Sequence, residues 1–261
     1  MKKFSTAIIG ATAIALGTFA AAAPAKAQSL APVTGQNYTV NFDTDAAGNP
    51  LSAGTKISNQ WQDYGLTISN ADPDPNSLDL MLFNSNCIAS GPDKNCSGDD
   101  GDLATGPSFG TAPQGNVLII SEDGDSSDPD DNAGGGTIIF SFTEAVSLDK
   151  LAILDLDEPR QGYIRAFNAD GLAQEYRMSE GTLVNPAHPG NNSLREYDFS
   201  GLDPESITSL EVAFPGSGAV SYLEFTGPSE EVPEPLTVLG LVTSGGFLAA
   251  ARQKRRRKMK S

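Results

Sequence analysis

Two short acidic stretches contain the residues whose type and spacing could do chemistry. Six aspartates in them are the candidate metal ligands: Asp99, Asp100, Asp102, Asp123, Asp125 and Asp128. Carboxylate oxygens at such close spacing suit Ca²⁺, a hard cation that prefers oxygen donors. The second stretch is not an EF-hand, because Gly134 stands where the twelfth position, counted from Asp123, requires a bidentate glutamate. We therefore expect either calcium binding by these loops or a solvated acidic surface without a cation.

Cys87 and Cys96 are the only two cysteines, and they lie in one loop of the chain. In an exported protein a disulfide between them is the default expectation. It would close a short ring, which chain-entropy models value at about 2 to 3 kcal/mol. A metal site or a nucleophilic thiol pair is the alternative, but there is no second cysteine pair and His188 is the single histidine.

Aromatic side chains are the candidates for stacking on a sugar ring, because an amphipathic ring covers a pyranose face while neighbouring amides and carboxylates bind its hydroxyls. The set comprises Trp61, Tyr64, Tyr163, Tyr176, Tyr197 and Tyr222. With aromatic residues at 7% of the chain, most of them are expected in the core. Trp61 is the one singled out here as a possible stacking platform.

No catalytic residue is predicted. The sequence has no Gly-x-Ser-x-Gly elbow, no zinc-ligand spacing and no phosphate-binding glycine loop, and His188 lies between Ala187 and Pro189 in an expected turn. Paired carboxylates for glycoside hydrolysis stay open as an alternative among the 33 acidic residues, but nothing singles out a pair.

The elements that must position these residues are short strands. Runs rich in β-branched and aromatic residues alternate with Gly, Pro, Asn, Asp and Ser clusters, a pattern typical of all-β domains. The expected strands are 38–42, 66–69, 78–83, 116–121, 137–142, 150–156, 162–168, 173–178, 194–199, 207–214 and 220–225. About eleven strands predict two packed sheets, a β-sandwich. Two long loops, 84–115 and 122–136, hold the cysteines and the aspartates.

The charge is distributed unevenly along the chain. Three of the 17 basic residues lie in 1–27 and seven in 252–260, whereas all 33 acidic residues lie between these ends. The part between the two basic ends therefore carries a formal charge of −26. Nucleic acid and anionic membranes are excluded as partners, while cations, neutral sugars and basic polymers are compatible.

The N-terminal residues 1–27 have the order of a secretory signal peptide. Lys2 and Lys3 precede an apolar run from residue 7 to 23, and Ala25-Lys26-Ala27 provides a small-x-small cleavage site. We expect a signal peptidase to cut after Ala27 and leave residues 28–228 as the acidic β-domain. A buried N-terminal helix is the alternative.

The C-terminal residues 229–261 combine three features. Pro233-Glu234-Pro235 precedes an apolar stretch at 236–251, long enough for one short transmembrane helix, and a basic tail follows at 252–260. This arrangement resembles the bacterial PEP-CTERM sorting domain, also called the ice-binding protein C-terminal domain. The resemblance implies an exosortase-like enzyme that cuts near the Pro-Glu-Pro after transient membrane anchoring. A permanent single-span anchor is the alternative.

The body also resembles a domain commonly paired with this tail, through phrases at 41–51, 99–105, 115–120 and 214–220. That resemblance implies an exported β-sandwich of the jelly-roll, carbohydrate-binding-module type, without an established activity. We therefore expect a non-enzymatic protein of the cell surface or extracellular matrix that binds exopolysaccharide, with calcium-ordered loops. The alternatives are a structural matrix protein without a specific ligand and a hydrolase acting on glycans.

Processing gives the first prediction. N-terminal sequencing of the exported protein should begin at Gln28, because Ala25 and Ala27 fit the small-residue pockets of a signal peptidase. A mature N-terminus before Ala21 would contradict the prediction, since the apolar run would then remain in the protein.

Overall fold

The computed structural model of the protein describes residues 31–71, 79–156 and 161–228. Several sequence predictions lie outside these ranges and stay predictions: the signal peptide 1–27 with Ala27, and the sorting segment 229–261 with Pro233, Glu234 and Pro235. Within the described ranges, no helix has the length and apolar character needed to cross a membrane.

The described residues form an almost purely β structure, as predicted. The strands are β1 (Asn37–Val40), β2 (Leu66–Asn70), β3 (Leu80–Asn84), β4 (Asn116–Ile120), β5 (Gly136–Leu154), β6 (Tyr163–Asn168), β7 (Gly171–Arg177), β8 (Thr182–Leu183), β9 (Leu194–Asp198), β10 (Ile207–Phe214) and β11 (Ala219–Thr226). Helical geometry in the described ranges is limited to single 3₁₀ turns: η1 (Gln62–Tyr64), η2 (Ser97–Asp99), η3 (Gly101–Leu103), η4 (Pro107–Phe109) and η5 (Met178–Glu180).

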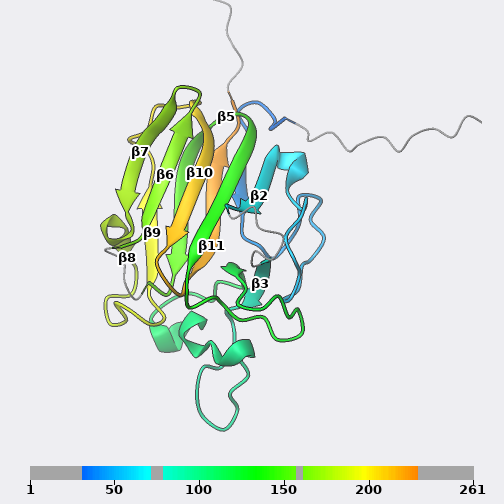
Figure 1. Cartoon of the computed structure of the whole chain (residues 1–261), viewed down its shortest axis with the longest axis vertical. Helices are drawn as coiled ribbons and strands as arrows, with labels where there is room; N and C mark the ends of the chain where they lie inside the picture. The colour runs from blue at the N-terminus through cyan, green and yellow to red at the C-terminus, as the bar shows by residue number, and fades with distance from the viewer. Residues whose placement is uncertain (1–30, 72–78, 157–160, 229–261) are drawn as a thin grey trace, which may run out of the picture.

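All of these strands are hydrogen-bonded, directly or through neighbours, to the long strand β5, and every named pair is antiparallel. The first part of β5 pairs with β2 and β10, and β10 continues to β6 and β7. The last part of β5 pairs with β9 and β11, and β11 continues to β1, β4 and β3. In Figure 1 the first part of β5 lies between β10 and β2, the two strands with which it pairs.

The sequence pattern stops a strand at residue 142 and starts another at 150, whereas the structure has one strand of 19 residues. Thr143 and Glu144 are both exposed, which hides the alternation, but Val146 and Leu148 return to the core and keep the strand extended. The polar pair therefore marks a local irregularity in β5, where its partners change.

The main core is one cluster to which both groups of strands contribute. Buried members from the β5–β10–β6 side include Ile138, Phe140, Ile164, Leu210 and Val212, and members from the other side include Leu118, Ile120, Leu151, Leu223 and Phe225. The predicted alternation in β10 is confirmed, since Leu210, Val212 and Phe214 are all core residues. Alternate positions of a strand point to opposite faces, so one face of each strand supplies this core.

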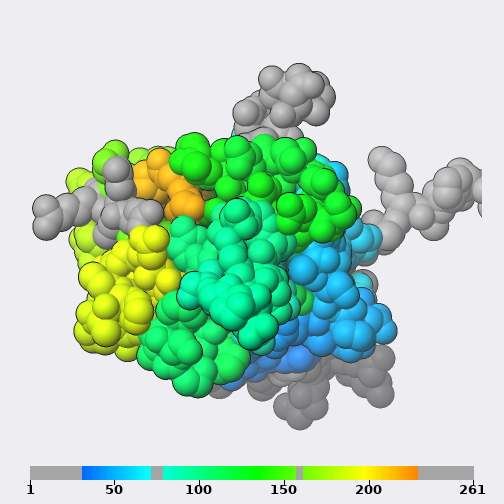
Figure 2. Space-filling view, turned by 90° about the horizontal axis from the view of Figure 1, so that it is seen from below, coloured from blue at the N-terminus to red at the C-terminus, as the bar shows by residue number. Residues whose placement is uncertain are grey.

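A second, smaller cluster lies on the opposite face of β4, where Val117 and Ile119 alternate with the core residues Leu118 and Ile120. This explains why residues 117–120 are all apolar, since both faces of β4 are covered. The loop that joins β3 to β4, residues 85–115, supplies part of that cover through Cys96, Leu103 and Ala104. We call it the covering loop. The loops in teal and green gather at one end of the molecule, as Figure 2 shows from below.

The disulfide between Cys87 and Cys96 is present, with an S–S distance of 2.07 Å, which confirms the prediction. Both cysteines contact the second cluster, Cys96 as a member and Cys87 packed against it. The bridge therefore holds the covering loop together above β3 and β4.

Candidate functional site

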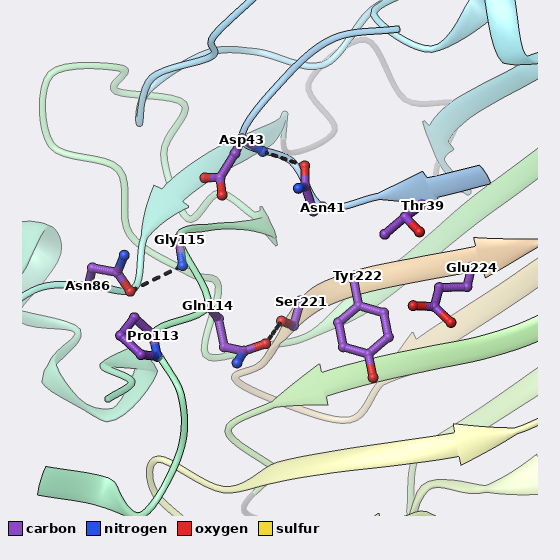
Figure 3. Close-up of a pocket in the computed structure, with 10 residues that line it drawn as sticks. All are labelled: Thr39, Asn41, Asp43, Asn86, Pro113, Gln114, Gly115, Ser221, Tyr222 and Glu224. Atoms are coloured by element: carbon purple, nitrogen blue, oxygen red, sulfur yellow. Dashed lines mark hydrogen bonds between the residues drawn. The ribbon is translucent and has the colours of Figure 1, made fainter. Parts of the chain in front are cut away.

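A polar groove of about 310 Å³ lies where the covering loop meets the ends of β1 and β11. Figure 3 shows the side chains that line it: Thr39, Asn41, Asp43, Asn86, Pro113, Gln114, Gly115, Ser221, Tyr222 and Glu224. They come from three places: β1 and the turn after it, the two ends of the loop that connects β3 to β4, and β11. The groove is therefore built by segments far apart in the sequence.

The turn after β1 is set by an unusual backbone at Phe42, whose φ is 62°. A bulky residue rarely adopts this left-handed conformation. The Phe42 ring is fully buried and meets the Trp61 ring edge to face, at 5.3 Å between ring centroids. Core packing thus holds the strained turn, and the neighbours Asn41 and Asp43 line the groove.

Asp43 is joined to the start of β4, which lies more than 70 residues further along the chain. Its Oδ1 accepts a hydrogen bond of 2.8 Å from the backbone N–H of Asn116. The Asn116 side chain is buried and donates from Nδ2 to the carbonyl oxygen of Leu51 at 3.0 Å. A side chain at position 115 would collide with both carboxylate oxygens of Asp43, so Gly115 is needed for this approach.

Two amide side chains of the covering loop line the groove and are held by hydrogen bonds. Asn86 Oδ1 accepts a hydrogen bond of 3.1 Å from the Gly115 N–H, and Gln114 Oε1 accepts one of 2.7 Å from the Ser221 hydroxyl. Figure 3 shows both bonds. The Nδ2 atoms of Asn41 and Asn86, and the carboxylate of Glu224, have no hydrogen bond to another described residue. These amide and carboxylate groups therefore keep unused hydrogen-bonding capacity.

Tyr222 is the aromatic side chain of the groove. On the paired strands Tyr222 lies opposite Ala152 of β5, and Ala152 lies opposite Glu196 of β9. Because alanine is small, the phenol reaches across β5 and its hydroxyl donates to Glu196 Oε1 at 2.9 Å. Burial raises the pKa of Tyr222, and the Glu196 carboxylate raises it further, so the hydroxyl remains a donor. The hydrogen bond fixes the ring, and the residue is half-buried and packed against the second cluster.

Trp61, the residue singled out for ligand stacking, is only 2% exposed and belongs to the main core. Its indole N–H donates to the carbonyl oxygen of Thr44 at 3.1 Å. The ring therefore packs the core and offers no face to a ligand in this structure. Tyr222, from the same set of candidate aromatics, is half-buried and lines the groove.

The six predicted metal ligands do not gather in one place. Asp99 pairs with Lys94 at 2.7 Å, Asp125 accepts from the Ser127 N–H, and Asp128 accepts from the Gly98 N–H. Across the described ranges, no group of three or more acidic, histidine or cysteine side chains is arranged to hold a metal ion. Calcium binding therefore stays a prediction.

The structure does place Asp100 and Asp102 close to two acids that the sequence analysis did not select, Asp130 and Asp131. Asp131 is buried and accepts hydrogen bonds from the Ser217 hydroxyl and the Gly218 N–H. Asp100 Oδ2 accepts from the Asp131 N–H at 2.7 Å. Burial raises the pKa of Asp100 to about 7, and the three neighbouring carboxylates contribute to the rise.

The groove lacks the groups that nucleophilic catalysis needs. Its lining contains no histidine, lysine or cysteine, and the Ser221 hydroxyl is bonded to an amide oxygen instead of a base. His188 lies elsewhere, against the Phe109 ring. The groove thus places amide, carboxylate and hydroxyl groups beside one aromatic ring.

Comparison of the chain with protein-family models and with curated proteins finds no match. The functional conclusion therefore rests on the residues and their geometry.

Gly115→Ala should destabilise the protein by about 2 to 4 kcal/mol, because φ is 73° there and the added methyl group displaces the Asp43 carboxylate. Gly48→Ala is the matched control, since Gly48 has φ 81° with no atom near the added group. It should cost about 1 to 2 kcal/mol from backbone strain alone. Denaturant unfolding measures both, and equal losses would show that the contact with Asp43 does not constrain position 115.

The raised pKa of Asp100 predicts a pH-dependent stability in protein freed of divalent cations. The folded state binds a proton at Asp100 more tightly than the unfolded chain, so this contribution is full below pH 3.8 and is lost as pH rises through about 7. Asp100→Asn, which mimics the protonated form, should raise the unfolding temperature at pH 8 and have little effect below pH 4. Asp99→Asn is the control, because Lys94 lowers the pKa of Asp99 and its neutralisation should not stabilise. Identical pH profiles for Asp100→Asn and wild type would refute the assignment.

Proposed function

We propose that this chain is an exported, non-enzymatic polysaccharide-binding protein of the cell surface or extracellular matrix. The observation that carries the proposal is the groove, in which a fixed tyrosine ring is surrounded by amide and carboxylate groups with unused hydrogen-bonding capacity. Sugars present apolar ring faces and many hydroxyls, and such a combination of groups complements both.

The finer fold that we propose is a two-sheet β-sandwich of the jelly-roll, carbohydrate-binding-module type. Support comes from the change of partners along β5, which pairs with β2 and β10 in its first part and with β9 and β11 in its last. Residues of both groups contribute to one core, as they would if two sheets faced each other. The groove would then lie on the outer face of the sheet that contains β11.

Export and sorting are proposed from the sequence of the two ends. The signal peptide at 1–27 would be removed by a signal peptidase, and the segment at 229–261 would anchor the chain transiently until an exosortase-like enzyme cuts near Pro233-Glu234-Pro235. The charge of −26 between the basic ends suits a domain released into an aqueous matrix, because like charges keep such chains apart. Nucleic acid is not a partner in this proposal.

Calcium enters the proposal as a possible counter-charge for the acidic loops, where Asp100, Asp102, Asp130 and Asp131 lie together. Burial is the main cause of the raised pKa of Asp100, and a bound cation would offset the repulsion from neighbouring carboxylates that adds to it. Thermal unfolding of chelator-treated protein at pH 8, with and without millimolar Ca²⁺, tests this, and an unchanged midpoint would exclude a stabilising site.

Tyr222→Ala should weaken oligosaccharide binding by about tenfold or more, because it removes the ring that we assign to stacking. Tyr222→Phe keeps the ring and loses only the bond to Glu196, so it should weaken binding less. Tyr163→Ala is the control, since Tyr163 is a partly exposed tyrosine on β6 that does not line the groove. Binding is measured on a glycan array and by calorimetry with the glycans that score.

Three outcomes would contradict the proposed function in different ways. No binding to any glycan would favour a structural matrix protein without a ligand. Binding that Tyr222→Ala leaves unchanged would place the site elsewhere. Release of reducing sugar from a bound polymer would make the protein a hydrolase.

A further inference from the structure

The charges around the groove carry a more specific conclusion about the ligand. We infer that the groove takes a polysaccharide with free amino groups, a hexosamine polymer that is not fully N-acetylated. The inference rests on the proposed function and names the class of sugar that the site selects.

Two carboxylates line the groove, and no basic side chain lines it with them. Asp43 uses Oδ1 to accept from the Asn116 N–H, and among the described residues Oδ2 has no hydrogen-bond donor. Glu224 takes part in none of the ion pairs found in the described part of the chain, which join Lys56 to Asp79, Lys94 to Asp99 and Arg165 to Glu175. Negative charge in the groove is thus left for a ligand to neutralise.

Lys150 of β5 is the cross-strand neighbour of Glu224, and it is shared between two acids. Lys150 lies opposite Glu224 on one side and opposite Asp198 of β9 on the other. Hydrogen bonds from Ser200 lower the pKa of Asp198, and the charge of Lys150 lowers it further. Glu196 adds another carboxylate two residues before Asp198 on β9, and it accepts the hydrogen bond from the Tyr222 hydroxyl. The surface around the ring therefore has more acidic than basic groups.

An amino sugar matches each part of this surface. Asp43 and Glu224 lie at different ends of the groove (Figure 3), so ammonium groups of different sugar units in the polymer can pair with them. The sugar hydroxyls can bind the amides of Asn41 and Asn86, and one sugar ring can stack on Tyr222. A polymer of uronic acids would instead bring like charges to these carboxylates, which costs binding energy. The charge of −26 between the basic ends extends the same preference over a longer range.

The test compares matched β-1,4-linked hexasaccharides, using the full chain and isothermal calorimetry at low salt. The glucosamine hexamer should bind at least tenfold more tightly than the N-acetylglucosamine and glucose hexamers, and a hexauronate should not bind. Glu224→Gln should remove most of the advantage of the glucosamine hexamer over the two uncharged hexamers, because glutamine can still form hydrogen bonds at this position but carries no charge. This variant is suited to the test because no described residue donates a hydrogen bond to the Glu224 carboxylate.

Glu144→Gln is the matched control, since Glu144 is an exposed acid on β5 that does not line the groove. If it reduced glucosamine binding as much as Glu224→Gln, the attraction would be to the overall charge and the inference would fall. If uncharged hexamers bound as tightly as glucosamine and Tyr222→Ala removed that binding, the inference would fall and the proposed function would stand. Binding to none of the hexamers would overturn both.

Discussion

The contact between Asp43 and the backbone of Gly115 and Asn116 is the constraint on which the groove depends. It joins the turn after β1 to the point where the covering loop returns into β4, two segments that share no strand pairing. The bond from the buried Asn116 side chain to Leu51 continues the same link. Without this junction, Asn41 and Asn86 would lie on independent loops and the groove would have no fixed width.

Core packing and a charged side chain both hold this junction in place. The left-handed turn at Phe42 and the glycine at 115 each cost conformational freedom, but the first is held by a buried aromatic pair and the second by a carboxylate. The disulfide adds a third restraint on the covering loop, from Cys87 to Cys96. Binding groups held in advance lose less entropy when a ligand arrives, so a shallow polar site can still be selective.

Much of the β framework followed from residue patterns, because alternation and turn residues are local signals. The apolar runs and the Gly, Pro, Asn, Asp and Ser clusters between them marked most of the strands, and two cysteines in one loop favoured a disulfide. The groove depends instead on long-range contacts. Nothing in the sequence next to Trp61 shows that it packs on Phe42. Two features indicate Tyr222: it lies between the core residues Val220 and Leu223, and an alanine lies opposite it on β5. The second feature is known only once the register of β5 is known.

The central claim is that sugars bind in the groove, and the most direct measurement is an NMR titration of the isotopically labelled protein with a bound oligosaccharide. The side-chain amide signals of Asn41, Asn86 and Gln114 should shift together and saturate with the same dissociation constant as the backbone signals around Tyr222. Signals from the acidic loop at 122–131 should stay in place. Shifts that appear in that loop, or on β6 and β7, while the three amides remain unperturbed would contradict the account.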